Sequence, residues 1–382
     1  MDFALTKEQQ ELREAVIDLA TRSLNIGAAE RYDSREFYWE GWKKCADFGI
    51  HGMAIPKQYG GLEMDLLTCV VVMEGLGYAS RDPGLLFSIN SHVWTCEAPI
   101  LTFGTEEQKK KYLCELANGS IVGGHAMTEP DSGSDAFSLR SEAKKVGNRY
   151  VLNGSKVFCT NAPIANVLLI FAKTGPGRGF GDISVFIVER GSPGLSFGKP
   201  IRTMGLRDCP LGEVVMQDCE VPAENLLGRE GDGGTIFASE MEQERSCLFA
   251  LHVGSMQRIE EDCVEYARTR KQFGKKLGSY QAISHKIADM RLRTEMARLA
   301  LHRAAWLRST GTRSPMASAV AKLYISEAYV QTCLDAVQIH GAYGYCEEQG
   351  IERSLRDAVG GKIYSGTSEI QRNIIARLMG LR

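Results

Sequence analysis

The chain has 382 residues, of which 44% are hydrophobic and 24% charged, with a formal net charge of −2. This length favours two or three packed units, and the near-neutral charge gives no reason to expect binding to nucleic acid or to an anionic membrane. No secretory leader or membrane-spanning run is recognised, and the eleven scattered cysteines lack the close spacing of a metal site. We therefore expect a cytoplasmic protein with free thiols and no bound metal.

Residues 1–119 predict a set of helices. Thr6, with Gln9 three positions later, suits a capping box at the start of the first helix. Residues 66–79 form an apolar stretch that is too long for a strand, which predicts a buried helix. Thr105 can begin a further helix, because threonine caps well and acidic residues follow it.

Residues 120–231 have a different character. Short β-rich runs alternate with Asn-Gly, Gly-Pro and Pro-Gly turn signals, which predicts an antiparallel β subdomain. Residues 127–135 combine hydroxyl and acidic side chains with Pro130 and Gly133, and they predict a rigid loop that presents N–H groups and hydroxyls to a ligand. An ordinary surface turn fits the same residues.

Helical periodicity returns over residues 232–382, so the whole chain has an α+β pattern with segregated layers. One helix is expected from about residue 235 to 268, and its apolar stripe includes Glu244, whereas Glu240 and Glu242 fall off the stripe and are expected in solvent. Two interpretations of Glu244 are open. Either the stripe ends there and Glu244 faces water or pairs with its neighbour, or Glu244 faces a cavity, where burial would raise its pKa and suit a general base.

Three later segments lie at the ends of helices. Residues 270–274 close one helix, residues 338–345 combine glycines with aromatics, and residues 364–369 precede an apolar helix that Thr367 or Ser368 can cap. Each segment could approach a ligand, and the last could bind a phosphate through free N–H groups. Taken one by one, ordinary helix ends explain them equally well.

Together these motifs resemble the acyl-CoA dehydrogenase family over essentially the whole chain. Residues 127–135 resemble its flavin and substrate loop, and residues 156–161 resemble its second flavin strand, with Phe158 where tryptophan is common. Its three C-terminal FAD motifs are matched by residues 270–274, 338–344 and 366–371. The resemblance implies an N-terminal helical domain, a middle antiparallel β-barrel or sandwich and a C-terminal four-helix bundle.

The resemblance also implies FAD, bound noncovalently between the β domain and the C-terminal helices, and a homotetramer built from dimers. The residues expected to contact FAD within one subunit are Met127, Thr128, Ser134, Phe158, Thr160, Thr367 and Glu369. Those expected to reach the FAD of a neighbouring subunit are Arg270, Phe273, Gln281, Gln338 and Gly341.

The implied reaction is α,β-desaturation of an acyl thioester, in which a carboxylate removes the α-proton while the flavin takes the β-hydride. The backbone N–H of Ser365 is expected to bind the thioester oxygen. Many members carry their catalytic glutamate at the position of Ser365, which cannot act as that base. A smaller branch, which includes isovaleryl-CoA dehydrogenase, carries it at the position of Glu244. We therefore predict Glu244 as the base, with Arg245 and Tyr364 beside the substrate.

A finer resemblance concerns the substrate. Residues 207–214, 244–250 and 356–361 resemble dehydrogenases that act on acyl or aminoacyl groups tethered to carrier proteins, such as prolyl-carrier-protein dehydrogenases of natural-product pathways. We expect an FAD-dependent oxidoreductase for such a thioester on an acyl or peptidyl carrier protein, with electron-transfer flavoprotein or oxygen as acceptor. A short branched-chain acyl-CoA dehydrogenase is the alternative, and a noncatalytic flavin-binding protein or an oxygenase using reduced flavin also remain open.

Overall fold

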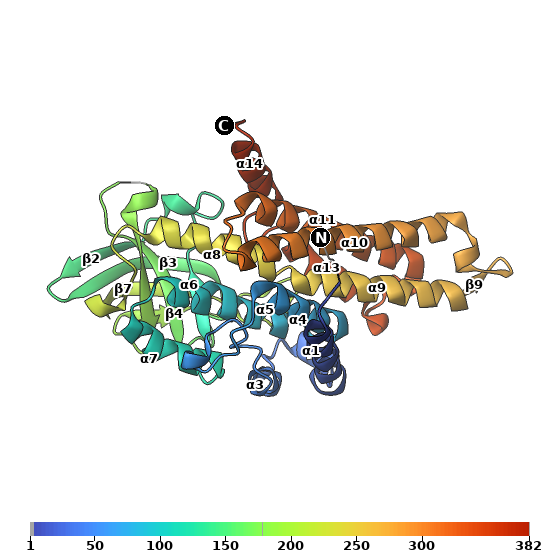
Figure 1. The fold of residues 1–382 in the computed structure, drawn as a ribbon, viewed down its shortest axis with the longest axis horizontal. Helices are drawn as coiled ribbons and strands as arrows, with labels where there is room; N and C mark the ends of the chain where they lie inside the picture. The colour runs from blue at the N-terminus through green and yellow to red at the C-terminus, as the bar shows by residue number, and fades with distance from the viewer. Residues whose placement is uncertain (1–3, 178, 382) are drawn as a thin grey trace.

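The computed structural model describes residues 4–177 and 179–381. A helical layer comes first in the chain and packs beside the C-terminal helices (Figure 1). Thr6 and Thr105 begin the first and last helices of this layer with complete capping boxes, which confirms both predicted starts. The helices are α1 (Lys7–Leu19), α2 (Ala28–Ser34), α3 (Trp39–Asp47), α4 (Leu66–Ala79), α5 (Pro83–His92), α6 (Ala98–Phe103) and α7 (Glu106–Ala117), with π-helical segments η1 (Ala20–Leu24) and η3 (Val93–Glu97).

One sheet follows, in the order β6-β7-β3-β2-β4-β5-β8, with β1 paired to β4. Most neighbours are antiparallel, but β1 and β2 run parallel to β4, so the sheet is mixed and not purely antiparallel as predicted. Its strands are β1 (Gly123–Ala126), β2 (Glu142–Val146), β3 (Arg149–Thr160), β4 (Val167–Lys173), β5 (Ile183–Glu189), β6 (Leu195–Phe197), β7 (Leu211–Pro222) and β8 (Leu226–Leu227).

The C-terminal part is helical, and α8, α9, α10 and α11 pack against one another as a four-helix arrangement. A short β9–β10 hairpin lies at the end of the molecule far from the sheet, and α14 projects away from the body (Figure 1). The elements are α8 (Gly233–Cys247), α9 (Ala250–Thr269), β9 (Lys271–Gln272), β10 (Lys275–Lys276), α10 (Gln281–Ser309), α11 (Pro315–His340), α12 (Ala342–Tyr345), α13 (Ile351–Gly360) and α14 (Ser368–Leu378).

The single helix predicted from residue 235 to 268 is wrong, because it breaks between α8 and α9 at Leu248 and Phe249. The N–H groups of Leu251 and His252 bond carbonyls three residues back, which changes the helical register. Immediately after the break α9 lies backbone to backbone against α4, where a side chain on Gly254 would collide with the carbonyl of Glu74. Tertiary packing, and not a proline or glycine at the break, therefore divides the helix.

The N-terminal and C-terminal helices share one hydrophobic core. Val16 and Leu76 from the first layer belong to the same buried cluster as Met256 and Leu301 from the last. The sheet buries two further clusters. Helix α8 contacts both the sheet and the bundle, so it joins the two parts of the molecule.

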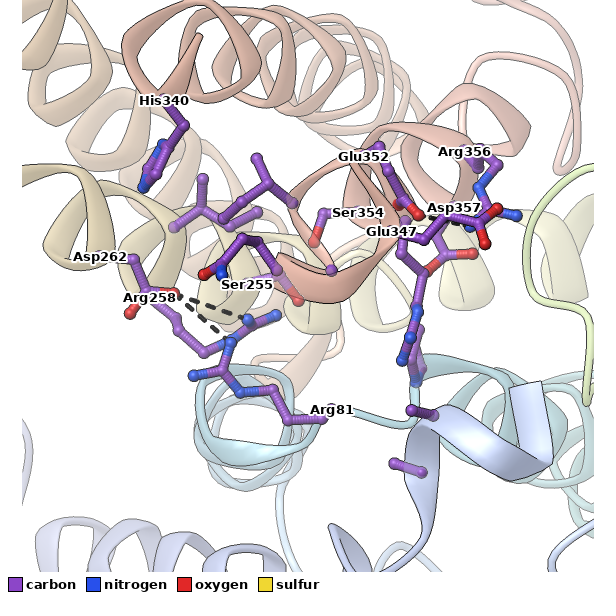
Figure 2. Close-up of a pocket in the computed structure, with 18 of the residues that line it drawn as sticks. Arg81, Ser255, Arg258, Asp262, His340, Glu347, Glu352, Ser354, Arg356 and Asp357 are labelled. Atoms are coloured by element: carbon purple, nitrogen blue, oxygen red, sulfur yellow. Dashed lines mark hydrogen bonds and ion pairs between the residues drawn. The ribbon is translucent and has the colours of Figure 1, made fainter. Parts of the chain in front are cut away.

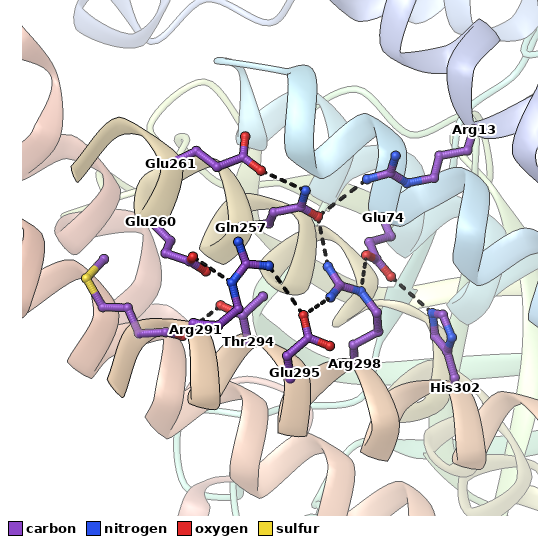
Figure 3. A network of polar contacts seen from close by, with 11 residues as sticks. Arg13, Glu74, Gln257, Glu260, Glu261, Arg291, Thr294, Glu295, Arg298 and His302 are labelled. Carbon is purple, nitrogen blue, oxygen red and sulfur yellow. Dashed lines mark hydrogen bonds and ion pairs between the residues drawn. The ribbon is translucent and has the colours of Figure 1, made fainter. Parts of the chain in front are cut away.

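A buried polar network also joins the two helical layers (Figure 3). Glu74 on α4 accepts hydrogen bonds from Arg298 at 2.8 Å and from His302 at 3.1 Å, both on α10. Arg298 also contacts Gln257 on α9 at 2.8 Å and Glu295 at 3.0 Å. Burial alone would raise the pKa of Glu74, but His302 and Arg298 outweigh it, so the pKa lies below its ordinary value.

We expect Glu74→Gln to destabilise the protein by about 2 kcal/mol at pH 7, because a buried ion pair loses one partner. The folded pKa of Glu74 lies below the unfolded value of about 4.3, so this contribution is complete at neutral pH and declines as the pH falls through the folded pKa. Urea unfolding midpoints of the wild type and Glu74→Gln, at pH 7 and at a pH below the folded pKa of Glu74, measure the effect. Glu295→Gln, at a more exposed position, is the control and should change stability by less than about 0.5 kcal/mol. Equal midpoints at pH 7, or a gap that widens in acid, would contradict the prediction.

Candidate active site

Glu244 lies near the C-terminal end of α8 and is 5% exposed. Its Oε1 accepts a hydrogen bond from the Ser365 hydroxyl at 2.7 Å, and its Oε2 has no partner among the described residues. The interpretation in which Glu244 faces water is therefore wrong. Burial raises the pKa of Glu244, while the Ser365 hydrogen bond and the Arg245 charge offset only part of that rise. A raised pKa places the carboxyl nearer the range in which a general base works best.

The loop before α14 brings Ser365 to this carboxylate. Ser365 has φ 57° and Gly366 has φ 84°, both in the left-handed region that few residues other than glycine adopt. The Ser365 carbonyl accepts hydrogen bonds from Arg245 Nε at 2.9 Å and Gln371 Nε2 at 3.1 Å. Within residues 4–177 and 179–381, no acceptor is seen for the Ser365 N–H. A free backbone donor beside a buried carboxylate can bind an oxygen that gains negative charge.

Tyr364 forms an aromatic wall next to Ser365. Its hydroxyl lies 2.8 Å from His252 Nε2, and its ring packs 4.7 Å from Phe87 and 5.9 Å from Phe249 between ring centroids. Burial, helped by the Lys322 charge, lowers the pKa of His252 to about 3, so this histidine is neutral. Tyr364 lies next to Ser365 in the chain, and Arg245 holds the Ser365 carbonyl, so their predicted roles beside a substrate stay predictions.

Residues 127–135 form the rigid loop that the sequence predicts. Glu129 and Ser132 form a two-residue bridge, and the buried Glu129 carboxylate contacts Lys156 Nζ at 2.7 Å and the N–H of Ser141 at 2.9 Å. Met127 is buried, and Thr128 accepts the N–H of Val157 at 2.9 Å. Opposite charges and backbone bonds therefore fix the loop against β3.

Phe158 is the exposed aromatic residue of β3. Its side chain is 60% exposed, and its backbone has φ 57°, which is unusual for an aromatic residue. Backbone in such a region that the fold maintains often marks a ligand site. Thr160 is half-buried on the same strand, and Ser134 is exposed in the neighbouring loop.

The remaining predicted cofactor residues fall into two groups. Thr367 caps α14 by accepting the N–H of Ile370 at 3.3 Å, next to the exposed Glu369. The neighbouring Ser368 hydroxyl is buried without a partner among the residues described. The second group is exposed and lies on or near the β9–β10 hairpin and the end of α11, and Phe273 at the hairpin tip is 93% exposed. This group is Arg270, Phe273, Gln281, Gln338 and Gly341.

The hairpin and the sheet lie at opposite ends of the molecule (Figure 1), so the hairpin residues are far from Phe158 and Thr160 on β3. The first group offers an exposed ring, hydroxyls and a helix N-terminus, which fit the flat ring, the polyol chain and the phosphates of FAD. The hairpin arginine carries the paired donors that suit a pyrophosphate.

Glu240 and Glu242, which the sequence placed in solvent, are both buried. Glu240 lies with Oε1 2.8 Å from Nδ1 of His125 on β1, and Glu242 accepts the N–H of Ser314 and faces Arg308. The prediction is wrong because α8 has neighbours on more than one side, so a polar residue off the apolar stripe still meets protein. The burial of Glu240 and Glu242 depends on side chains from distant segments, namely His125 and Arg308.

A cavity of ≈ 920 Å³ lies elsewhere, between α2, α9 and α13 (Figure 2). None of the predicted site residues lines it. Some of its charged side chains pair with one another: Arg81 lies 3.4 Å from Asp262, and Arg356 lies 2.8 Å from Glu352. This cavity is therefore separate from the buried pair of Glu244 and Ser365.

Helices that precede and follow a β layer along the chain define an α+β fold with segregated layers. The N-terminal, middle and C-terminal domain families of acyl-CoA dehydrogenase match residues 6–120, 124–219 and 231–380. The chain belongs to the acyl-CoA dehydrogenase family. No helix in the described part of the chain is long and apolar enough to cross a membrane.

Among its relatives, an L-prolyl-[peptidyl-carrier protein] dehydrogenase of a Serratia species is 42% identical over 382 residues, covering 100% of this chain and 99% of the relative. A crystal structure of the prolyl acyl carrier protein oxidase AnaB superimposes with a TM-score of 0.97 at 45% identity, covering 99% of this chain and 100% of that one. PigA with FAD and proline gives a TM-score of 0.98 at 41% identity, with 100% of both chains covered.

We predict that Ser365→Ala raises the pKa of Glu244 further, because a hydrogen bond to the ionised form is lost. Infrared titration of the carboxyl band, assigned with Glu244→Gln, measures this pKa without a substrate. Ser246→Ala is the control, since this buried serine on the same helix bonds only the Glu242 carbonyl at 2.8 Å. An unchanged Glu244 pKa in Ser365→Ala would contradict the prediction.

Proposed function

We propose that this protein is an FAD-dependent dehydrogenase that oxidises the Cα–Cβ bond of a prolyl thioester tethered to a carrier protein. The observation that carries the proposal is the buried Glu244 carboxylate, 2.7 Å from the Ser365 hydroxyl and next to a free backbone N–H. The prolyl-carrier-protein relatives, which match the full chain at 42 and 45% identity, support the substrate class.

Each residue has its own role in the proposed reaction. Glu244 removes the α-proton of the thioester, and its raised pKa lets it hold that proton inside the protein. The Ser365 N–H binds the thioester oxygen as negative charge develops there. Tyr364 and Phe87 exclude water on one side of the substrate. Met127, Thr128, Ser134, Phe158, Thr160, Thr367 and Glu369 would hold FAD, which when bound would supply the acceptor for the hydride of the β-carbon.

The exposed group on the hairpin and α11 serves the FAD of a neighbouring subunit. Helix α10 supports such an assembly, because Leu292, Met296, Leu299 and Trp306 recur at helical spacing on it and are all exposed. Val320, Tyr324 and Leu334 add exposed apolar area on α11, which packs against α10. A homotetramer built from dimers buries these side chains.

Leu299→Glu should dissociate this assembly, because a charge within an apolar interface costs more than the contacts there provide. Light scattering should give a smaller particle than the wild type, and FAD should be lost on dilution as the neighbour's hairpin is removed. Lys144→Glu reverses an exposed charge on β2, at the end of the molecule opposite the hairpin and away from α10, and should leave the particle size unchanged. A wild-type particle size for Leu299→Glu would contradict this interface.

The electron acceptor is electron-transfer flavoprotein or oxygen, and the enzyme works in the cytoplasm. Nine buried, unpaired cysteines support a reducing compartment. Formation of hydrogen peroxide in air, without added electron-transfer flavoprotein, would identify oxygen as the acceptor.

Glu244→Gln should lower turnover about 10²- to 10⁴-fold while FAD stays bound, because only the base is lost. Mass spectrometry of wild-type reactions with prolyl-carrier protein and with isovaleryl-CoA tests the substrate. We expect loss of two or four hydrogens from the prolyl group only. Oxidation of isovaleryl-CoA alone would favour a branched-chain acyl-CoA dehydrogenase, and unchanged turnover by Glu244→Gln would remove Glu244 from the reaction.

A further inference from the structure

Glu240 is a second buried carboxylate beside Glu244 that the proposed reaction does not use. It lies one helical turn before Glu244 on α8 and is 3% exposed. Side chains four residues apart on a helix are neighbours, with Cβ atoms about 5–6 Å apart. Two carboxylates therefore lie next to each other in the protein interior, with few cations to balance them.

The partners of Glu240 leave one of its oxygens free. Oε1 lies 2.8 Å from Nδ1 of His125, but out of line for a hydrogen bond, and Oε2 has no partner in the described structure. The Nε of Arg245 donates a hydrogen bond to the Ser365 carbonyl at 2.9 Å and not to Glu240. A buried carboxyl with an unmet oxygen is costly unless a ligand completes it.

We propose that Glu240 binds the α-amino nitrogen of the substrate and so selects an aminoacyl thioester over a simple acyl thioester. This inference rests on the proposed function. The nitrogen of a prolyl group is bonded to the same α-carbon whose proton Glu244 removes. A group that binds that nitrogen must therefore lie within a few ångströms of the base, which is where a residue one turn away on α8 lies.

The charge balance of the site agrees with this role. Burial raises the pKa of Glu240, and the charges of His125 and Arg245 only partly offset the rise. A protonated carboxyl beside a free amine and an ionised carboxylate beside an ammonium group both have a net charge of zero, and only the second is an ion pair. A charge-assisted N–H···O contact of about 2.7–2.9 Å would then satisfy the free oxygen. A simple acyl group leaves that oxygen unmet, which disfavours its binding.

The test compares Glu240→Gln with wild type on prolyl-carrier protein and on the same carrier loaded with a cyclopentanecarbonyl group, which has the ring without the nitrogen. We expect kcat/KM for the prolyl substrate to fall about 100-fold or more in Glu240→Gln. The value for the carbocyclic substrate should change less than about threefold. Glu242→Gln is the matched control, because it changes a buried carboxylate on the same helix that faces Arg308 and the N–H of Ser314. It should leave the ratio between the two substrates unchanged.

Equal losses on both substrates, or a loss of FAD that accounts for the lower activity, would overturn the role of Glu240. A wild-type measurement needs no variant: N-acetylprolyl-carrier protein, whose nitrogen carries no charge, should react at least 100-fold more slowly than the prolyl form. If the wild type turns over both equally, the inference fails while the proposed function stands. If it oxidises the cyclopentanecarbonyl group in preference to prolyl, the proposed substrate fails and the inference falls with it.

Discussion

The structure depends on keeping one carboxylate out of water without locking it into a salt bridge. Glu244 contacts a hydroxyl, that of Ser365, where a lysine or arginine would have lowered its pKa and weakened the base that we propose. The adjacent Arg245 turns to the Ser365 carbonyl, so it shapes the loop and does not pair directly with the base. The left-handed backbone at Ser365 and Gly366 is the conformational cost of that arrangement.

The rest of the fold places this contact. Helix α8 runs from the sheet into the helical part of the molecule and carries Glu240 and Glu244 in the interior. It ends before α9 comes into close contact with α4. The break at Leu248 and Phe249 makes both arrangements compatible. Glu74, Arg298 and His302 then hold α4 to α10 across the shared core, so the N-terminal layer supports the helices that carry the site.

Much of the fold could be predicted from local patterns. The β-rich region predicted over residues 120–231 includes β4 at residues 167–173 and β5 at residues 183–189, where both faces of the strand are buried and the apolar run is continuous. The break in α8–α9 and the burial of Glu240 could not be predicted, because both arise from segments distant in the sequence. Glu244 was recognisable as an acid on an apolar stripe, yet its partner Ser365 lies 121 residues away. The assigned roles of the cofactor residues came from family resemblance and not from local pattern.

The core shared by the first and last helical layers has a consequence for synthesis on the ribosome. The apolar helix α4 finds its principal neighbour, α9, only after the whole sheet has been translated. At typical elongation rates that interval is on the order of ten seconds, during which the apolar surface of α4 is not yet covered by α9. Until translation nears its end, the nascent chain therefore exposes the kind of apolar surface that chaperones bind.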